Sequence, residues 1–319
     1  LAQASGMPAS TLHLQLASGG SAIPDGALVV IDEASMADTR TLARYLATIP
    51  DTARVLMVGD DHQLPAVGPG GAFAEACRRV TPARLDRHLR QREPWEARCL
   101  DNLRARSEEG VTAALAAWAE HGRVHQAEDR VAAERHLVRA WWESAQTSGL
   151  SEAVMIASTR GEVAHLNAAA RGLLHAAGQL GADHMIGRST LATGDRVACT
   201  ANQYDLGLRN GMAGTVLTVE PEKVEVQFDD GQVVEIPADY IAGGHLDHRY
   251  ALTGHRSQGG TFEHVHVLAP AAGQLAEWGY VALSRHRGPV HIYLCADPIQ
   301  DAHIPEPSQP PQPLERLAQ

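Results

Sequence analysis

The chain has 319 residues, which is enough for two ordinary domains and a small inserted one. Hydrophobic residues make up 44% and charged residues 20%, an ordinary globular composition. The formal net charge of −11 argues against non-specific coating of nucleic acid, although it leaves room for a local basic groove.

The sequence has no feature of a membrane or secreted protein. No apolar run approaches the ~20 residues that a membrane helix needs, so we expect no membrane insertion. The four cysteines lie far apart without a C-x-x-C pair, which argues against zinc or a disulfide framework and favours the cytoplasm. The start, Leu1-Ala2-Gln3, has neither an initiator Met nor a basic segment, and we interpret the chain as an internal piece of a longer protein.

The first part of the chain alternates between strand and helix patterns. Short apolar runs predict buried strands at 27–31 and 55–58, separated by a helix at 38–48, which is typical of a parallel βαβ unit. Residues 96–148 have a helical pattern, in which Trp118, Trp141 and Trp142 are expected to anchor the core. A further strand is predicted at 153–157 and a helix at 162–175.

The pattern then changes to short strands and hairpin turns. Strands are predicted at 196–200, 214–219, 224–228 and 233–236, with turns at Asn210-Gly211 and Asp229-Asp230-Gly231. The α/β pattern resumes with strands at 265–268 and 290–294, which bracket a segment at 278–287. This order predicts a small all-β insertion within an α/β domain. The proline-rich segment 304–313 is expected to be an extended linker.

Two carboxylates follow the first predicted strand. Asp32 and Glu33 come directly after Val29-Val30-Ile31, at the strand end where α/β sheets place their ligands. In such a position Asp32 can hold Mg²⁺, directly or through water, and Glu33 can polarise an attacking water. The alternative is that Asp32 only caps the following helix.

Polar residues also follow the next predicted strand. Gly59 permits a tight exit from the strand, and Gln63 is placed to reach a phosphate or a water. Asp60 is alternatively a turn residue and His62 a surface residue. An Asp-Glu pair and a Gly-Asp-x-x-Gln run at neighbouring strand ends are together far more specific than either alone, and they favour a nucleotide site.

These runs resemble motifs of a known helicase family. Asp32-Glu33-Ala34-Ser35 resembles the Walker B motif of RecD-like superfamily 1 helicases, and Gly59-Asp60-Asp61-His62-Gln63-Leu64-Pro65 resembles their motif III. Thr11-Leu12-His13 resembles the motif upstream of Walker B that touches single-stranded DNA. The resemblance is greatest to the helicase half of TraI/TraA-type conjugative relaxases.

The resemblance continues in order through the second half of the chain. Arg90-Gln91 resembles the motif IV pair, Thr253-Gly254-His255-Arg256-Ser257-Gln258-Gly259 resembles motif V, and Tyr280-Val281-Ala282-Leu283-Ser284-Arg285 resembles motif VI. It implies that Arg90 and Arg285 supply guanidinium groups to the γ-phosphate across a cleft from Asp32. It also implies DNA contacts and nucleotide contacts. The implied DNA contacts are Thr11, His13, Thr159, Thr253, His255, Arg256 and Ser257, and the nucleotide contacts are Gly59, Asp60, Gln258 and Gly259.

The chain departs from the family at two places. Arg256 stands where motif V usually has lysine, which keeps the charge and changes the shape. A Walker A loop needs G-x-x-x-x-G-K-[ST], and the only lysine, Lys223, is followed by Val224. The chain therefore contains no Walker A motif, which in the family would lie upstream of Leu1. We expect this fragment to be unable to turn over ATP by itself.

The resemblance implies an α/β fold of two RecA-like (P-loop NTPase) domains. The first, truncated domain would span 1–85. The second would span 86–189 and 244–300, with an SH3-type barrel inserted at 190–243 and a tail at 301–319. The implied function is ATP- and Mg²⁺-dependent movement 5′→3′ on single-stranded DNA, with duplex DNA and other conjugation proteins as further partners. Two alternatives stay open: a non-catalytic single-stranded DNA-binding remnant, and an RNA helicase of the same superfamily.

Overall fold

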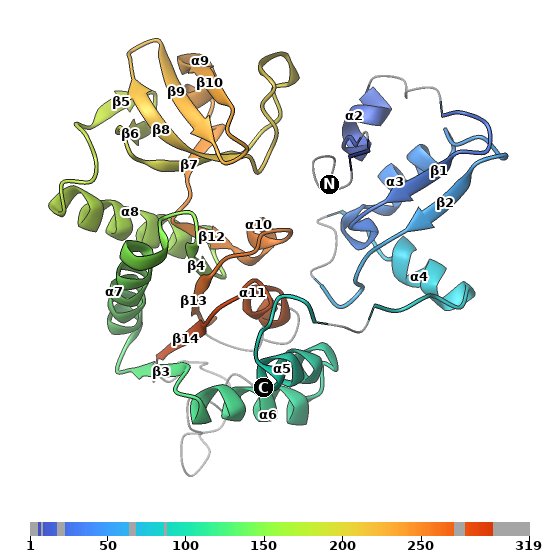
Figure 1. Ribbon diagram of the computed structural model, residues 1–319, viewed down its shortest axis with the longest axis horizontal. Helices are drawn as coiled ribbons and strands as arrows, with labels where there is room; N and C mark the ends of the chain where they lie inside the picture. Colours follow the sequence, from blue (N-terminus) through green and yellow to red (C-terminus); the bar gives the residue numbers. More distant parts are fainter. Residues whose placement is uncertain are drawn as a thin grey trace, which may run out of the picture. The chain divides into compact units, whose positions relative to one another are not determined.

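The computed structural model describes residues 6–7, 9–17, 23–63, 68–85, 88–270 and 278–295. The chain forms two compact units, Leu1–Arg87 and His88–Gln319, and each is described by itself. Figure 1 shows the helices and strands of both units. The predicted linker at 304–313 and the tail at 301–319 lie outside the described residues. No helix in the described part is long and apolar enough to cross a membrane.

The first unit is built around a pair of parallel strands. Strand β1 (Leu28–Ile31) pairs with β2 (Arg54–Met57) from Leu28↔Arg54 to Ile31↔Met57. Between them lie η1 (Ala34–Met36) and α3 (Thr39–Leu46), and α3 begins where the Asp38 carboxylate accepts a 2.9 Å hydrogen bond from the Thr41 amide. Helices α2 (Leu12–Ala17) and α4 (Ala72–Arg79) complete the unit. The predicted βαβ order is confirmed, but the prediction that its strands are buried is wrong, because Ile31 is the one buried residue of β1 and β2.

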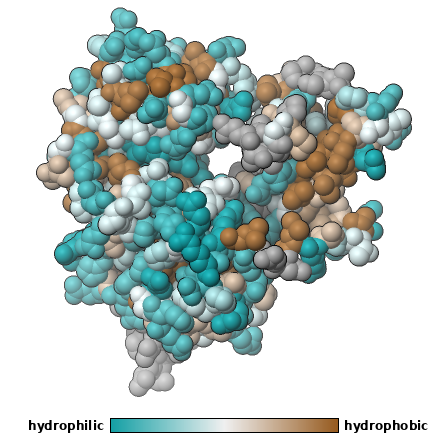
Figure 2. Space-filling model, in the orientation of Figure 1, coloured by the Kyte–Doolittle hydropathy of each residue, from teal (hydrophilic) through white to brown (hydrophobic). Residues whose placement is uncertain are grey.

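One face of this two-stranded sheet is apolar and exposed. Ile31, Ala34, Leu42 and Phe73 form the small core of the unit. On the other face, Leu28, Val30, Leu56 and Val58 are 60%, 40%, 48% and 37% exposed. Figure 2 shows hydrophobic side chains gathered over β1 and β2. We call these four residues the exposed sheet face. Parallel strands are normally covered on both faces, so this exposure is unusual.

The second unit contains a parallel sheet of five strands in the order β12-β4-β13-β14-β3. Its strands are β3 (Val124–Ala127), β4 (Ala153–Ala157), β12 (Ala251–Thr253), β13 (His264–Leu268) and β14 (Val290–Cys295). Helices α7 (Arg130–Ser148) and α8 (Arg160–Ala176) share a core with it, in which Trp141 and Met155 are fully buried. Helices α5 (Pro94–Arg104), α6 (Glu108–Glu120), α10 (Gly254–Ser257) and α11 (Tyr280–Leu283) also belong to this unit.

The helical pattern predicted over 96–148 is wrong in its middle. Strand β3 interrupts it at Val124–Ala127 and pairs in parallel with β14. The segment Val-His-Gln-Ala is short and only half apolar, so its extended form depends on pairing with a strand far away in sequence. Trp118 and Trp141 are buried anchors, as predicted, and Trp142 is half-buried.

A five-stranded antiparallel sheet lies between β4 and β12 in the chain. Its order is β10-β9-β8-β7-β11. The strands are β7 (Arg196–Cys199), β8 (Ala213–Val219), β9 (Lys223–Phe228), β10 (Val233–Pro237) and β11 (Leu246–His248). The hairpin of β5 (His184–Ile186) and β6 (Ser189–Leu191) precedes it, and η2 (Tyr204–Leu206) and α9 (Ala238–Ala242) lie within it. The all-β segment therefore runs from His184 to His248, wider than the expected 190–243.

A buried carboxylate joins this inserted sheet to the parallel sheet. Asp195 is fully buried and accepts hydrogen bonds from Arg171 of α8 at 2.9 Å, the Tyr250 hydroxyl at 2.8 Å and the Ala192 amide at 2.8 Å. Burial opposes its charge, but the His248 ring, 3.5 Å away, and the hydrogen bonds from Arg171 hold the pKa of Asp195 down to about 2. The Asp195 carboxylate therefore ties α8 to both points where the chain enters and leaves the insertion.

Candidate functional site

The carboxyl ends of β1 and β2 lie side by side. The Val58 amide donates to the Ile31 carbonyl at 2.8 Å, and the Ala34 amide donates to the Val58 carbonyl at 2.8 Å. Asp32 and Glu33 leave β1 at this point; Asp32 is exposed and Glu33 is half-buried. The backbone of Glu33 is left-handed, with φ 49° and ψ 40°, which is strained for a residue with a side chain. Such strain is common at functional sites.

Gly59 allows the chain after β2 to pass close to the chain after β1. A Cβ atom at Gly59 would lie 3.0 Å from the Ser35 amide nitrogen and 3.2 Å from the Phe73 ring. The Asp60 carboxylate then accepts a hydrogen bond from the backbone amide of His62 at 3.1 Å. The backbone amide of Gln63 donates to the Asp60 carbonyl at 3.2 Å. Asp60 thus shapes the turn that presents Gln63, which is the alternative reading of this residue.

The polar atoms around these strand ends suit the metal and water side of a nucleotide. Within the described residues, Ser35 Oγ and Gln63 Oε1 are buried without a hydrogen-bond partner. Such atoms are costly to leave unpaired, so they favour a bound water or ligand. No group of three or more His, Cys, Asp or Glu side chains that could hold a metal is found in the described part. Mg²⁺ beside a phosphate needs only one or two carboxylates, which Asp32 satisfies.

The phosphate-binding side does not fit in the same way. The only lysine of the chain, Lys223, lies in β9, where its Nζ is 2.5 Å from Glu235 Oε1. It is therefore part of the inserted sheet and is paired there. The residues of this chain fit the Mg²⁺ end of the site and do not include a lysine for the β- and γ-phosphates.

Thr11 and His13 lie at the start of α2. Thr11 Oγ1 accepts from the Leu14 amide at 3.2 Å, so Thr11 caps the helix, and both side chains are exposed.

In the second unit, Gln91 brings motif IV beside motif VI. Its side-chain amide donates to the His286 carbonyl at 3.1 Å and to the Ser284 carbonyl at 3.5 Å. The His286 ring lies 3.3 Å from the Glu96 carboxylate, and both side chains are buried. Arg90, directly before Gln91, is half-buried. The sequence gives no signal for these contacts, because Gln91 and His286 are 195 positions apart.

Arg285 is held within its own turn. Its guanidinium is 1% exposed and donates to the Val281 carbonyl at 2.9 Å and to Ser284 Oγ at 2.7 Å. These bonds fix the side chain close to the backbone of α11, so in this structure the guanidinium presents almost no surface to a phosphate, contrary to the sequence expectation. Arg90 and Arg285 belong to the second unit, whereas Asp32, Glu33 and Gln63 belong to the first.

Motif V forms the end of β12 and the short helix α10. Thr253 caps α10, with its Oγ1 accepting from the Arg256 amide at 3.3 Å. His255 and Arg256 are exposed, and Arg256 pairs with Asp247 at 2.7 Å. Ser257 corrects the sequence expectation. Its side chain is fully buried and donates to the Gly254 carbonyl at 2.8 Å, so in this structure it stabilises the turn and presents no surface to DNA.

Gln258 and Gly259 end motif V. Both polar atoms of the Gln258 side-chain amide are buried without a hydrogen-bond partner in the described part. Such atoms favour a bound water or ligand. Gly259 has φ 76°, a conformation that favours glycine.

Thr159 has a structural role that the sequence analysis did not assign to it. Its Oγ1 accepts from the Glu162 amide at 3.2 Å while Glu162 accepts from the Thr159 amide at 2.9 Å, a capping box at the start of α8. The Thr159 side chain stays exposed although it caps the helix.

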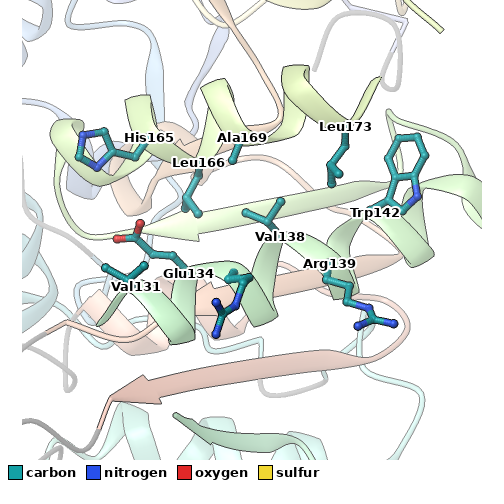
Figure 3. A pocket seen from close by; sticks show the side chains of 10 residues that line it. Val131, Glu134, Val138, Arg139, Trp142, His165, Leu166, Ala169 and Leu173 are labelled. Atoms are coloured by element: carbon teal, nitrogen blue, oxygen red, sulfur yellow. The ribbon is translucent and has the colours of Figure 1, made fainter. Parts of the chain in front are cut away.

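An apolar groove between α7 and α8 lies apart from the motifs. Figure 3 shows Val138 and Trp142 of α7 facing Leu166, Ala169 and Leu173 of α8. None of the residues that line this groove is a motif residue. The groove therefore adds nothing to the candidate site.

Comparisons with known proteins show which families the chain resembles. The AAA domain family matches residues 1–129, and the UvrD-like helicase C-terminal domain family matches residues 248–293. The conjugal transfer protein TraA of Rhizobium radiobacter is 30% identical over 289 residues, which cover 88% of this chain and 26% of that protein. The ATP-dependent RecD2 DNA helicase of Deinococcus radiodurans is 29% identical over 273 residues, covering 81% of this chain and 36% of that protein.

The chain is a homologue of TraA proteins and RecD-type helicases. The resemblance to RecD-like superfamily 1 helicases is therefore confirmed. The chain spans about a quarter of the length of the TraA relatives.

Solved structures support the fold. A Pif1 helicase from Bacteroides bound to single-stranded DNA matches with a TM-score of 0.55 and 20% identity, covering 94% of this chain and 76% of that one. The same helicase in complex with ADP-AlF3 and single-stranded DNA matches with a TM-score of 0.52 and 18% identity, covering 98% of this chain and 75% of that one. Together with the parallel sheets, these matches show a RecA-like, P-loop type α/β fold.

Proposed function

We propose that the chain is the greater part of the motor of an ATP-dependent 5′→3′ DNA helicase, from a TraA-like conjugative protein. The observation that carries this proposal is the adjacency of the two strand ends in the first unit, which sets Asp32 and Glu33 beside the Gly59–Gln63 turn. The homology with TraA and RecD2 supports it.

Each candidate residue has a role in this motor. ATP with Mg²⁺ supplies the phosphoanhydride bond that is broken. Asp32 would hold the Mg²⁺, and Glu33 and Gln63 would orient the attacking water. We propose that Arg90 of the second unit stabilises negative charge on the γ-phosphate, and that Arg285 does so once its guanidinium leaves the Val281 carbonyl and the Ser284 hydroxyl. Gln91 holds Arg90 and motif VI in one arrangement, so it is a positioning residue.

The DNA side of the proposal rests on motif V and the inserted sheet. Exposed Thr11, His13, Thr159, His255 and Arg256, with half-buried Thr253, are proposed to contact the backbone of single-stranded DNA. We propose that the five-stranded inserted sheet is an SH3-type barrel beside this path, with duplex DNA ahead of it. Other conjugation proteins are proposed partners of the whole protein, as the TraA homology implies.

Binding and hydrolysis separate under this proposal. The purified chain should bind a single-stranded oligonucleotide, as measured by fluorescence anisotropy, yet show no DNA-stimulated ATP hydrolysis, because it has no P-loop lysine. His255→Ala should weaken the binding roughly tenfold, the usual value of a hydrogen bond to a charged group. His184→Ala, an exposed histidine in β5, is the matched control and should bind like the parent chain. Strong ATPase activity of the chain alone would contradict the assignment of the nucleotide site.

A non-catalytic DNA-binding remnant is the second candidate, favoured by the missing P-loop lysine. Joining the chain to the P-loop segment of a TraA relative distinguishes the two. A motor fragment should gain ATPase activity that Glu33→Gln abolishes while ATP binding remains. A remnant should stay inactive although the joined protein binds ATP.

A further inference from the structure

Arg249 lies in the short connection between the inserted sheet and the motif V strand. It follows β11 (Leu246–His248) and precedes β12 (Ala251–Thr253). Its backbone amide donates to the Arg196 carbonyl at 2.9 Å, and the next residue, Tyr250, is fully buried with its hydroxyl on Asp195. The backbone at Arg249 is therefore held from both sides.

The charges around Arg249 do not balance. Arg196 pairs with Asp229 through two hydrogen bonds of 2.7 and 2.8 Å, and Arg256 pairs with Asp247 at 2.7 Å. Among the described residues, the Arg249 side chain donates one long hydrogen bond, of 3.4 Å, to the Gly211 carbonyl. Three arginines thus share two aspartates, and one positive charge remains.

This excess charge is partly enclosed. Burial, and then the neighbouring Arg196 charge, lower the pKa of Arg249 below its usual range, while Asp229 only partly offsets them. A guanidinium that is desolvated beside other cations is stabilised by an anion, and its planar fork matches two oxygens of a phosphate.

We propose that Arg249 binds a backbone phosphate of single-stranded DNA where the inserted sheet joins motif V. This inference rests on the proposed function and adds a contact that the motif pattern does not assign. Arg249 is four positions before Thr253, so one short stretch of chain carries both contacts. Through Gly211 and Arg196, the same side chain and backbone also touch the inserted sheet. The phosphate would thereby connect the inserted sheet to motif V.

The test measures the affinity of the full chain for a fluorescein-labelled oligo-dT by anisotropy, at several salt concentrations. Arg249→Gln should weaken binding roughly tenfold at low salt. It should also make the slope of log K against log salt shallower by about 0.7, the value for one phosphate contact on a single strand. Arg249→Lys should keep the slope with a smaller loss of affinity, because it keeps the charge and loses the fork.

The matched control is Arg139→Gln, which removes the same charge from a side chain of α7 that is 82% exposed. It should leave both affinity and slope unchanged. Thermal unfolding of each variant reports whether the fold is kept. An unchanged slope in Arg249→Gln, with or without a lower melting temperature, would overturn the inference, since a structural arginine does not release counterions from DNA. Failure of the parent chain to bind oligo-dT would instead contradict the proposed function itself.

Discussion

The absence of a side chain at Gly254 allows motif V to pack closely against the segment before motif VI. A Cβ at Gly254 would lie 2.6 Å from Trp278 Nε1 and 2.9 Å from Trp278 Cδ1. Trp278 stands just before α11 and is 6% exposed, so its indole has little room to move. The helix of motif V can approach the motif VI segment this closely only because residue 254 is glycine.

Gly254→Ala should therefore lower the free energy of unfolding by about 1–3 kcal/mol, the usual cost of overpacking. Gly172→Ala is the matched control, because Gly172 lies inside α8 with no atom within 4 Å of the added Cβ. That control should raise stability by about 0.5–1 kcal/mol through helix propensity. Urea unfolding of both variants gives the comparison. Equal effects of the two substitutions would show that the Trp278 contact carries no constraint.

Individual side chains were predicted unevenly by the sequence, for a physical reason. Asp32 and Gly59 could be placed because a strand end is a local property, and the parallel register then sets them side by side. Ser257 could not, because its burial depends on the packing around α10, and a motif letter does not distinguish a buried hydroxyl from an exposed one. Thr159 had a readable signal in the run Thr-x-x-Glu, which forms the capping box.

At the scale of elements, Asp195 is the point where the insertion is fixed to its parent. Asp195→Asn should lower the free energy of unfolding by about 3 kcal/mol, because it leaves Arg171 facing a neutral amide in a buried site. Asp183→Asn removes the other carboxylate that Arg171 contacts, but that side chain is 47% exposed, and we expect a much smaller loss. Chemical denaturation measures both. Losses of similar size would mean that burial of Asp195 adds nothing.

The Asp195 interaction also has a defined pH window. The pKa of Asp195 in the folded chain is about 2, below the usual aspartate value of 3.8. The stabilisation from Asp195 is therefore complete above about pH 4 and is lost as the pH falls towards 2.

Elements were predictable where the local pattern was strong. The apolar runs of β1, β4 and β13 and the Asp-Asp-Gly turn before β10 are visible in the sequence and are confirmed. The order of strands in each sheet is set by pairing between distant segments, such as β3 with β14, and no local pattern encodes it. The 13 residues 200–212, which join β7 to β8, are longer than the Asn-Gly turn suggested.

On the scale of the whole molecule, three histidines of the parallel sheet predict sensitivity to acid. His125 of β3 contacts His291 of β14 at 2.9 Å, and His266 of β13 contacts Ser144 at 3.0 Å and the Tyr293 hydroxyl at 3.2 Å. Burial, and then neighbouring positive charges, lower the pKa of His266 to about 3 and of His291 to about 4. Burial, and then His136 and Arg123, also lower the pKa of His125. Arg123 also faces this group, and burial lowers the pKa of His264 in β13 as well.

Because the folded pKa values lie below the unfolded value near 6.5, the unfolded chain binds more protons in acid. Stability should be complete above about pH 6.5 and fall towards pH 4, by up to about 1.4 kcal/mol per pH unit for each proton. Thermal unfolding between about pH 7.5 and 4.5 measures how steeply stability falls with pH. Replacing both His125 and His291 by Gln should flatten it, whereas His184→Gln should not. A parental slope in the double variant would assign the acid sensitivity to other groups.

A segment that covered the exposed sheet face would also stabilise the strand ends that carry Asp32 and Glu33. Any segment that packs on Leu28, Val30, Leu56 and Val58 binds the folded strands and not the unfolded ones, so it stabilises them by mass action. The same strands end at the two carboxylates. Thermodynamic linkage is reciprocal. If the covering segment raises the affinity of the strand ends for a ligand, the ligand raises the affinity of the exposed sheet face for that segment by the same factor. Binding of a ligand at the ends of β1 and β2 and binding of a segment to the exposed sheet face therefore both report on the same folding equilibrium of these strands.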